Sequence, residues 1–237
     1  MVHVSRGGEG PLLVLLHGLG ATGSAWRGAV GSWPGSWLVV DLPGHGRSAP
    51  LGRYSFGSLA AAVASVVPAG PVAVLGHSLG GVVALALASG WFGVDVRAAA
   101  GLGVKLRWTE GELARAAGLA AKPPRVFPTR AEASGWAAKL AGVPLEDGVV
   151  ETPDGWRAAL DPAAFGVGAP DVDGLLAAAR CPVLLAAGED DPMCPPGDLL
   201  AAQPGGMVLA GVGHNAHVEE PGSIRPVLDR LHHALLG

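Results

Sequence analysis

The stretch PVAVLGHSLGGVVALALAS, residues 71–89, joins a short apolar run to a helix-like segment through a glycine-rich turn. Residues 71–75 have the length and the unbroken apolar character of a strand buried on both faces, which is typical of a parallel sheet. Residues 79–89 are expected to form the helix that follows, and between the two lies Gly-x-Ser-x-Gly with Ser78 at its centre. A strand, a tight turn and a helix in this order predict one unit of an open α/β sheet.

Similar apolar runs recur along the chain, at residues 11–16, 37–40, 98–104, 182–187 and 207–210. Helix-like stretches lie between several of them, and another closes the chain at residues 221–236. We therefore predict an α/β fold, a mostly parallel open sheet with helices on both faces. Sheets of this kind place their ligand chemistry in the loops that follow the carboxyl ends of the strands.

One interval, residues 105–181, is too long for a loop without structure of its own. Thr109 and Thr129 are each followed three residues later by a glutamate, the pattern of a capping box at the start of a helix. We expect residues 106–170 to form a small helical cap inserted after the sixth strand. Residues 1–105 and 171–237 would then form the core.

Composition excludes several classes of protein. The 16 lysines and arginines against 20 aspartates and glutamates give a formal charge of −4, which argues against nucleic acid or an anionic membrane as the main partner. Two cysteines are too few for a disulfide-stapled secreted scaffold, and no apolar run is long enough to span a bilayer. Without an export signal pattern at the N-terminus, we expect a cytoplasmic monomer or homodimer that acts on a small molecule.

The loops after two later runs carry the residue types that a reactive serine needs. A serine hydroxyl is inert near neutral pH unless a base accepts its proton and a third group orients that base. GEDDP at residues 188–192 supplies carboxylates, and GVGHNAH at residues 211–217 supplies imidazoles. The order serine, acid, histidine is the one that accompanies a serine at a strand-to-helix elbow.

These blocks resemble the α/β-hydrolases of the capped, single-domain kind. The resemblance also covers HGLG at residues 17–20, DLPGHGRS at 41–48 and the stretch from Gly213-His214 through Glu220-Pro221. It implies Ser78 as nucleophile, His214 as general base and then acid, and Asp191 as the orienting carboxylate. The oxyanion hole would consist of the backbone N–H groups of Leu19 and Leu79. A serine at the elbow disfavours the family members that carry an aspartate there, such as haloalkane dehalogenases and epoxide hydrolases.

Neighbouring residues compete for these roles. Asp190 is the nearest alternative for the acid, and His217 is the alternative for the base. We expect His17 and His45 to brace the backbone of their loops. His77, next to the nucleophile, is expected to point away from it across the turn.

The first glycine-rich loop also fits a different chemistry, the binding of a dinucleotide. Gly18, Gly20 and Gly23, followed by Asp41, have the spacing of a dinucleotide-binding fingerprint. Only 12 residues separate Gly23 from Ser36, which barely leaves room for the crossover helix that such a site needs. The sequence also lacks metal-binding motifs such as His-Glu-x-x-His. We therefore expect neither a cofactor nor a metal.

The aromatic residues suggest the substrate pocket. Its candidate walls are Trp26, Trp108, Trp136 and Met193. They favour an apolar or aromatic acyl group, although Arg107 or Arg130 could instead hold a substrate carboxylate.

The sequence thus predicts a serine hydrolase that cleaves a carboxylic ester, thioester or related activated acyl compound. An alternative is cleavage of a carbon–carbon bond next to a ketone by the same three residues. A third hypothesis, of another class, is a non-hydrolytic ligand receptor or retired binding module.

Overall fold

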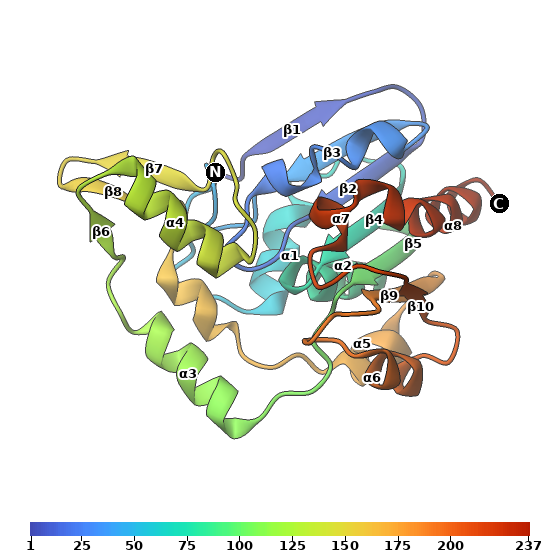
Figure 1. Ribbon diagram of the computed structural model, residues 1–237. Coiled ribbons are helices and arrows are strands. Elements are labelled where there is room, and N and C mark those ends of the chain that lie inside the picture. The colour runs from blue at the N-terminus through green and yellow to red at the C-terminus, as the bar shows by residue number, and fades with distance from the viewer.

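A seven-stranded sheet forms the centre of the computed structural model, which describes residues 1–237 (Figure 1). The strand order is β1-β3-β2-β4-β5-β9-β10, and only β1 runs antiparallel to its neighbour. The strands are β1 (Val4–Gly7), β2 (Leu12–Leu16), β3 (Ser36–Val40), β4 (Pro71–His77), β5 (Asp95–Leu102), β9 (Val183–Gly188) and β10 (Met207–Leu209). The predicted fold class, a mostly parallel α/β sheet, is confirmed.

Both faces of the sheet are covered, which explains why its strands are apolar without alternation. In β2, Leu13 and Leu15 pack into one hydrophobic cluster while Val14 and Leu16 pack into another, and all four are buried. The first cluster also contains residues of η1 (Gly23–Trp26), α7 (Ala216–Glu219), η4 (Pro221–Ile224) and α8 (Arg225–Leu236). The opposite face is covered by α1 (Phe56–Ala64), α2 (Leu79–Ala88), α5 (Val172–Ala178) and α6 (Pro196–Ala202).

The segment between β5 and β9 forms a substructure of its own beside the sheet (Figure 1). It consists of α3 (Glu110–Ala120), β6 (Val126–Phe127), α4 (Arg130–Ala141), β7 (Val149–Thr152), β8 (Gly155–Ala158) and η3 (Pro162–Val167). The two helices begin where the sequence predicted, because Thr109 and Thr129 each form a complete capping box with the glutamate three residues on.

The inserted segment differs from the expectation in two respects. It follows β5, the fifth strand of the chain, and not the sixth. It also contains a three-stranded antiparallel sheet of order β6-β8-β7, so it is not purely helical. These strands are two to four residues long and mostly half-buried, and such short segments give almost no periodic signal.

The connection between β2 and β3 decides against a dinucleotide site. It contains only the short 3₁₀ turns η1 and η2 (Val30–Ser32), so the glycine-rich loop does not lead into the long crossover helix on which a pyrophosphate would rest. As for membranes, none of the helices combines the length and the apolar character that crossing a bilayer requires.

Candidate active site

Ser78 occupies a strained turn between β4 and α2. Its backbone has φ 50° and ψ −113°, and it is the only residue other than glycine with a positive φ. A conformation of this kind costs about 1–3 kcal/mol and is retained where the surrounding structure imposes it. The flanking glycines explain the motif, because a Cβ on Gly76 would overlap the carbonyl group of Gly80, and one on Gly80 would overlap that of Leu16. The close approach of strand and helix therefore requires Gly-x-Ser-x-Gly.

His214 and Asp191 form a hydrogen-bonded pair across the ends of β9 and β10. The Nδ1 atom of His214 lies 2.9 Å from Oδ2 of Asp191 and 3.1 Å from Oδ1. An ionised carboxylate can only accept hydrogen bonds, so Nδ1 carries the proton and donates it. This assigns the tautomer in which Nε2 of His214 has a free lone pair and can act as a base.

The Asp191 carboxylate is buried, with 2% of the residue exposed, yet it stays ionised. Burial opposes ionisation, but the hydrogen bond from His214 and the backbone N–H groups of Met193 and Cys194 outweigh it and lower the pKa of Asp191 below its ordinary value. Asp191 is thus a fixed negative charge behind the imidazole. Asp190, its competitor, is exposed, and its side chain makes no hydrogen bond, so the geometry favours Asp191.

Two residues that the sequence analysis did not assign to the site hold the His214 loop. Glu219 accepts hydrogen bonds from the backbone N–H groups of Gly213 at 2.6 Å and Asn215 at 2.9 Å, the residues on either side of His214. His77 donates from Nε2 to the carbonyl oxygen of His214 at 2.8 Å, and the two rings lie 4.6 Å apart. The expectation that His77 merely points away is therefore incomplete, because it braces the loop of the candidate base.

His217, the competitor for the base, is unsuited to that role. It is 1% exposed and packs between the rings of Trp26, at 4.3 Å, and His77, at 4.5 Å. Neither of its ring nitrogens has a hydrogen-bond partner, and the carboxylate of Asp191 bonds to His214 instead.

Four histidines are fully enclosed and form what we call the buried histidine group: His17, His45, His77 and His217. Burial is the main cause that lowers the pKa of His17 to about 4 and those of His45 and His217 to about 3, and it lowers the pKa of His77 well below 6.5. All four are neutral at pH 7 as a result.

The expected bracing role of His17 and His45 is confirmed. His17 accepts the backbone N–H of Leu42 at Nε2 and donates from Nδ1 to the carbonyl oxygen of Gly18. His45 bonds through Nδ1 to the carbonyl oxygen of Pro43.

The two backbone groups expected to form an oxyanion hole are available as donors. The N–H of Leu19 makes no hydrogen bond within the chain. Leu79 is the first residue of α2, so its N–H has no acceptor inside the helix, and the positive end of the helix dipole lies at this point. The Ser78 hydroxyl likewise makes no hydrogen bond to another residue.

Of the four residues predicted to line the substrate pocket, only Trp136 lines the cavity of the inserted segment. Trp26 does not line this cavity; it is fully buried in the core, with its ring 4.3 Å from that of His217. Trp108 is half-buried under the ammonium group of Lys105, and Met193 is 37% exposed; neither lines that cavity.

A strained serine at a strand-to-helix elbow, with an acid and a histidine paired at the ends of later strands, is the arrangement of a hydrolase built on an open α/β sheet. The family model described as "Alpha/beta hydrolase family" matches residues 13–225. The chain therefore belongs to the α/β-hydrolase family.

Curated relatives match a short part of the chain. A pimeloyl-[acyl-carrier protein] methyl ester esterase of Aeromonas hydrophila is 47% identical over 91 residues, which cover 37% of this chain and 35% of the relative. The magnesium-chelatase 30 kDa subunit of Rhodobacter capsulatus is 41% identical over 87 residues, 34% of this chain and 31% of that protein. The matched stretch thus spans about a third of these relatives.

Solved structures match the fold over nearly the whole chain. The thioesterase domain from the curacin biosynthetic pathway superposes with a TM-score of 0.76 at 20% identity, covering 97% of this chain and 95% of that one. An E-2-(acetamidomethylene)succinate hydrolase gives the same TM-score and identity, over 98% and 95% of the two chains. At this identity the likeness concerns the fold.

Proposed function

We propose that this chain is a serine hydrolase that cleaves a carboxylic ester, thioester or related activated acyl compound through an acyl-enzyme on Ser78. One observation carries the proposal. The buried carboxylate of Asp191 accepts a hydrogen bond from Nδ1 of His214, which leaves Nε2 as the basic atom of the ring, and Ser78 occupies the strained elbow after β4. The curated relatives named as methyl ester esterases support an ester as the first substrate class to test.

The reaction follows from the roles of these groups. The hydroxyl oxygen of Ser78 attacks the substrate carbonyl carbon while its proton passes to Nε2 of His214. The resulting imidazolium is stabilised by the charge of Asp191, which remains ionised throughout. Removing either partner would leave the hydroxyl a poor nucleophile near neutral pH.

The oxygen that gains negative charge is stabilised by the N–H groups of Leu19 and Leu79. His214 then gives its proton to the leaving alcohol or thiol, and the acyl group stays on Ser78. In the second half, His214 takes a proton from a water molecule, whose oxygen attacks the acyl carbon. The oxygen of Ser78 then leaves the acyl carbon as it takes this proton back from His214, which releases the acid and restores the starting state.

The test is turnover by the wild type and by Ser78→Ala on a panel of simple esters, thioesters and vinylogous diketones. We expect hydrolysis of esters or thioesters that falls by at least 10³-fold in the variant while the circular dichroism spectrum stays unchanged. Ser65→Ala is the matched control, because the Ser65 hydroxyl bonds only to the carbonyl oxygen of Ala62 on α1.

Each of the other outcomes would favour an alternative hypothesis or refute the assignment of Ser78. Activity confined to the diketones would favour the carbon–carbon alternative. Full activity in Ser78→Ala would refute the nucleophile assignment. No turnover of any panel member, together with an unreactive Ser78, would favour a binding module.

A further inference from the structure

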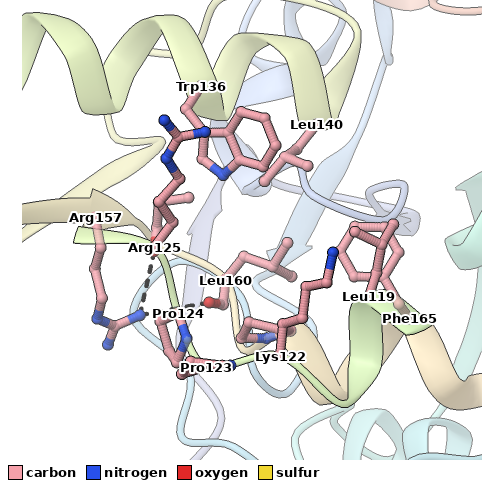
Figure 2. A pocket seen from close by; sticks show the side chains of 12 residues that line it. Leu119, Lys122, Pro123, Pro124, Arg125, Trp136, Leu140, Arg157, Leu160 and Phe165 are labelled. Carbon is pink, nitrogen blue, oxygen red and sulfur yellow. Dashed lines mark hydrogen bonds between the residues drawn. The ribbon is translucent and has the colours of Figure 1, made fainter. Parts of the chain in front are cut away.

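A partly open cavity of about 200 Å³ lies within the inserted segment, lined by residues of α3, α4, β8 and η3 and of the loops between them (Figure 2). Its apolar lining is Leu119, Trp136, Leu140, Ala158, Leu160 and Phe165, with prolines completing the wall. At about 30 Å³ for each water-sized group, it has room for roughly six or seven such groups. This is the size of a short acyl chain.

The charged residues of this cavity are all positive. Lys122, Arg125 and Arg157 line it, no aspartate or glutamate does, and none of the three forms an ion pair in the structure. The chain as a whole carries a charge of −4, so this concentration of cations runs against its average. Lys122 and Arg125 are exposed and Arg157 is half-buried, and together they give the cavity a positive potential that attracts an anion.

Arg157 provides the strongest indication. Its side chain is half-buried, and its guanidinium donates only to the carbonyl oxygens of Ala158 at 3.2 Å and Leu160 at 3.4 Å. A partly buried charge without a counter-ion is unfavourable unless a ligand supplies one. A carboxylate is the partner whose geometry matches the guanidinium fork.

Arg125 is also placed where its guanidinium can bind a carboxylate. Its guanidinium lies 4.7 Å from the ring centre of Phe127 and 5.3 Å from that of Trp136. Figure 2 shows Arg125 beside the Trp136 ring at the cavity wall. Stacking uses the face of the guanidinium and leaves its N–H edges free to donate to an anion.

One residue of the cavity wall, Leu140, contacts the loop that carries the Leu19 N–H, although neither Ser78 nor His214 lines the cavity itself. A Cβ on Gly20, in the loop that carries the Leu19 N–H, would lie 2.9 Å from the backbone of Leu140. Trp136 and Leu140 also pack in the same hydrophobic cluster as Leu19 and Leu79, whose N–H groups would bind the oxyanion. The wall of the cavity thus touches the loop that would hold the reacting carbonyl.

From this placement we propose that the cavity binds the far end of the substrate's acyl group and that this end carries a carboxylate, recognised by Arg125, Arg157 and Lys122. The inference rests on the proposed function and narrows its substrate class to esters of short acyl chains with an anionic terminus. The apolar wall contacts the methylene groups of the chain.

The experiment compares two p-nitrophenyl esters of equal chain length, p-nitrophenyl hexanoate and the mono-p-nitrophenyl ester of adipic acid. In the wild type we expect the adipate ester to be preferred at least tenfold in kcat/KM. Arg125→Gln and Arg157→Gln should each lower kcat/KM for the adipate ester by about 10- to 100-fold and change that for the hexanoate ester less than threefold, because a hydrogen bond to a charged group is lost. Arg115→Gln, an exposed arginine on α3 outside the cavity, is the matched control and should change neither value.

A binding measurement distinguishes failure of the anionic-terminus proposal from failure of the proposed hydrolase function. In Ser78→Ala, calorimetric titration should show monomethyl adipate binding more tightly than methyl hexanoate, and added Arg125→Gln should abolish the difference. Ser78-dependent hydrolysis with equal kcat/KM for the two esters, or equal binding of the two ligands, would overturn the anionic-terminus proposal while leaving the proposed function standing. Turnover that survives Ser78→Ala alongside selective binding of the adipate ligand would overturn the proposed function instead.

Discussion

Replacing Asp191 by asparagine changes the charge of the candidate site and almost none of its shape. Oδ1 of Asp191 accepts the N–H groups of Met193, at 2.8 Å, and Cys194, at 3.2 Å, whereas Oδ2 faces Nδ1 of His214 at 2.9 Å. In the variant, the amide oxygen keeps the place of Oδ1, because only an oxygen can accept those two N–H groups. The amide NH₂ therefore points at His214.

An NH₂ group can only donate, so Nδ1 of His214 must become the acceptor and its proton must move to Nε2. The imidazole then presents an N–H to Ser78 where the reaction needs a lone pair. We expect kcat/KM to fall by about 10³- to 10⁴-fold, which corresponds to about 4–5.5 kcal/mol in transition-state stabilisation.

The assay is ester hydrolysis at pH 7.5 by Asp191→Asn and by Asp190→Asn, which makes the same chemical change one residue earlier at an exposed position. Asp190→Asn should stay within twofold of the wild type. A large loss at 190 together with a small loss at 191 would refute the reasoning, since it would mean that the other carboxylate orients the base.

Further predictions concern stability. Gly80→Ala should destabilise the fold by several kcal/mol or prevent folding, because the new Cβ overlaps the backbone of Leu16. Gly118→Ala on α3, where no atom lies within 4 Å of the new Cβ, should instead raise the free energy of unfolding by about 0.5–1 kcal/mol. Urea denaturation measures both changes. The buried histidine group should make the fold sensitive to acid. Folding lowers the pKa values of the four imidazoles, so below pH 6.5 the unfolded chain binds protons that the folded chain does not. The free energy of unfolding therefore falls as the pH falls. At pH 5.5 each of the four should cost about 1.4 kcal/mol relative to pH 7.5, and an unchanged urea midpoint between these two pH values would contradict their burial in neutral form. Thr109→Ala should lower the free energy of unfolding by about 1 kcal/mol, because it removes the side-chain cap of α3, and no change would show that α3 does not depend on that cap.

The sheet and the residues at its strand ends could be read from the sequence because each rests on local pattern. The apolar runs give the strands, and Gly76 and Gly80 are required by contacts within one strand–turn–helix unit. The position of the carboxylates after β9 follows from the strand pattern, but the choice of Asp191 over its neighbour Asp190 came from the family resemblance, and the structure pairs Asp191 with His214.

Contacts between distant segments could not be read in this way. The hydrogen bond from His77 to the carbonyl oxygen of His214 joins residues 137 positions apart. The hydrogen bonds that Glu219 accepts from the backbone on either side of His214 depend on the fold of that loop. Trp26 looked like a pocket wall because aromatic side chains often line pockets, but the packing of η1 on the sheet buries it. Arg157 gave no signal either, since its lack of a counter-ion is a property of the folded cavity.

The central claim is that the Ser78 hydroxyl is activated by an imidazole that a buried carboxylate orients. Its most direct test is covalent labelling with a fluorophosphonate, followed by peptide mass spectrometry, in the wild type and in His214→Gln. The account predicts a single labelled site at Ser78, with labelling slowed at least a thousandfold in the variant. A label on another residue, or equal labelling rates at Ser78 in the two proteins, would contradict it.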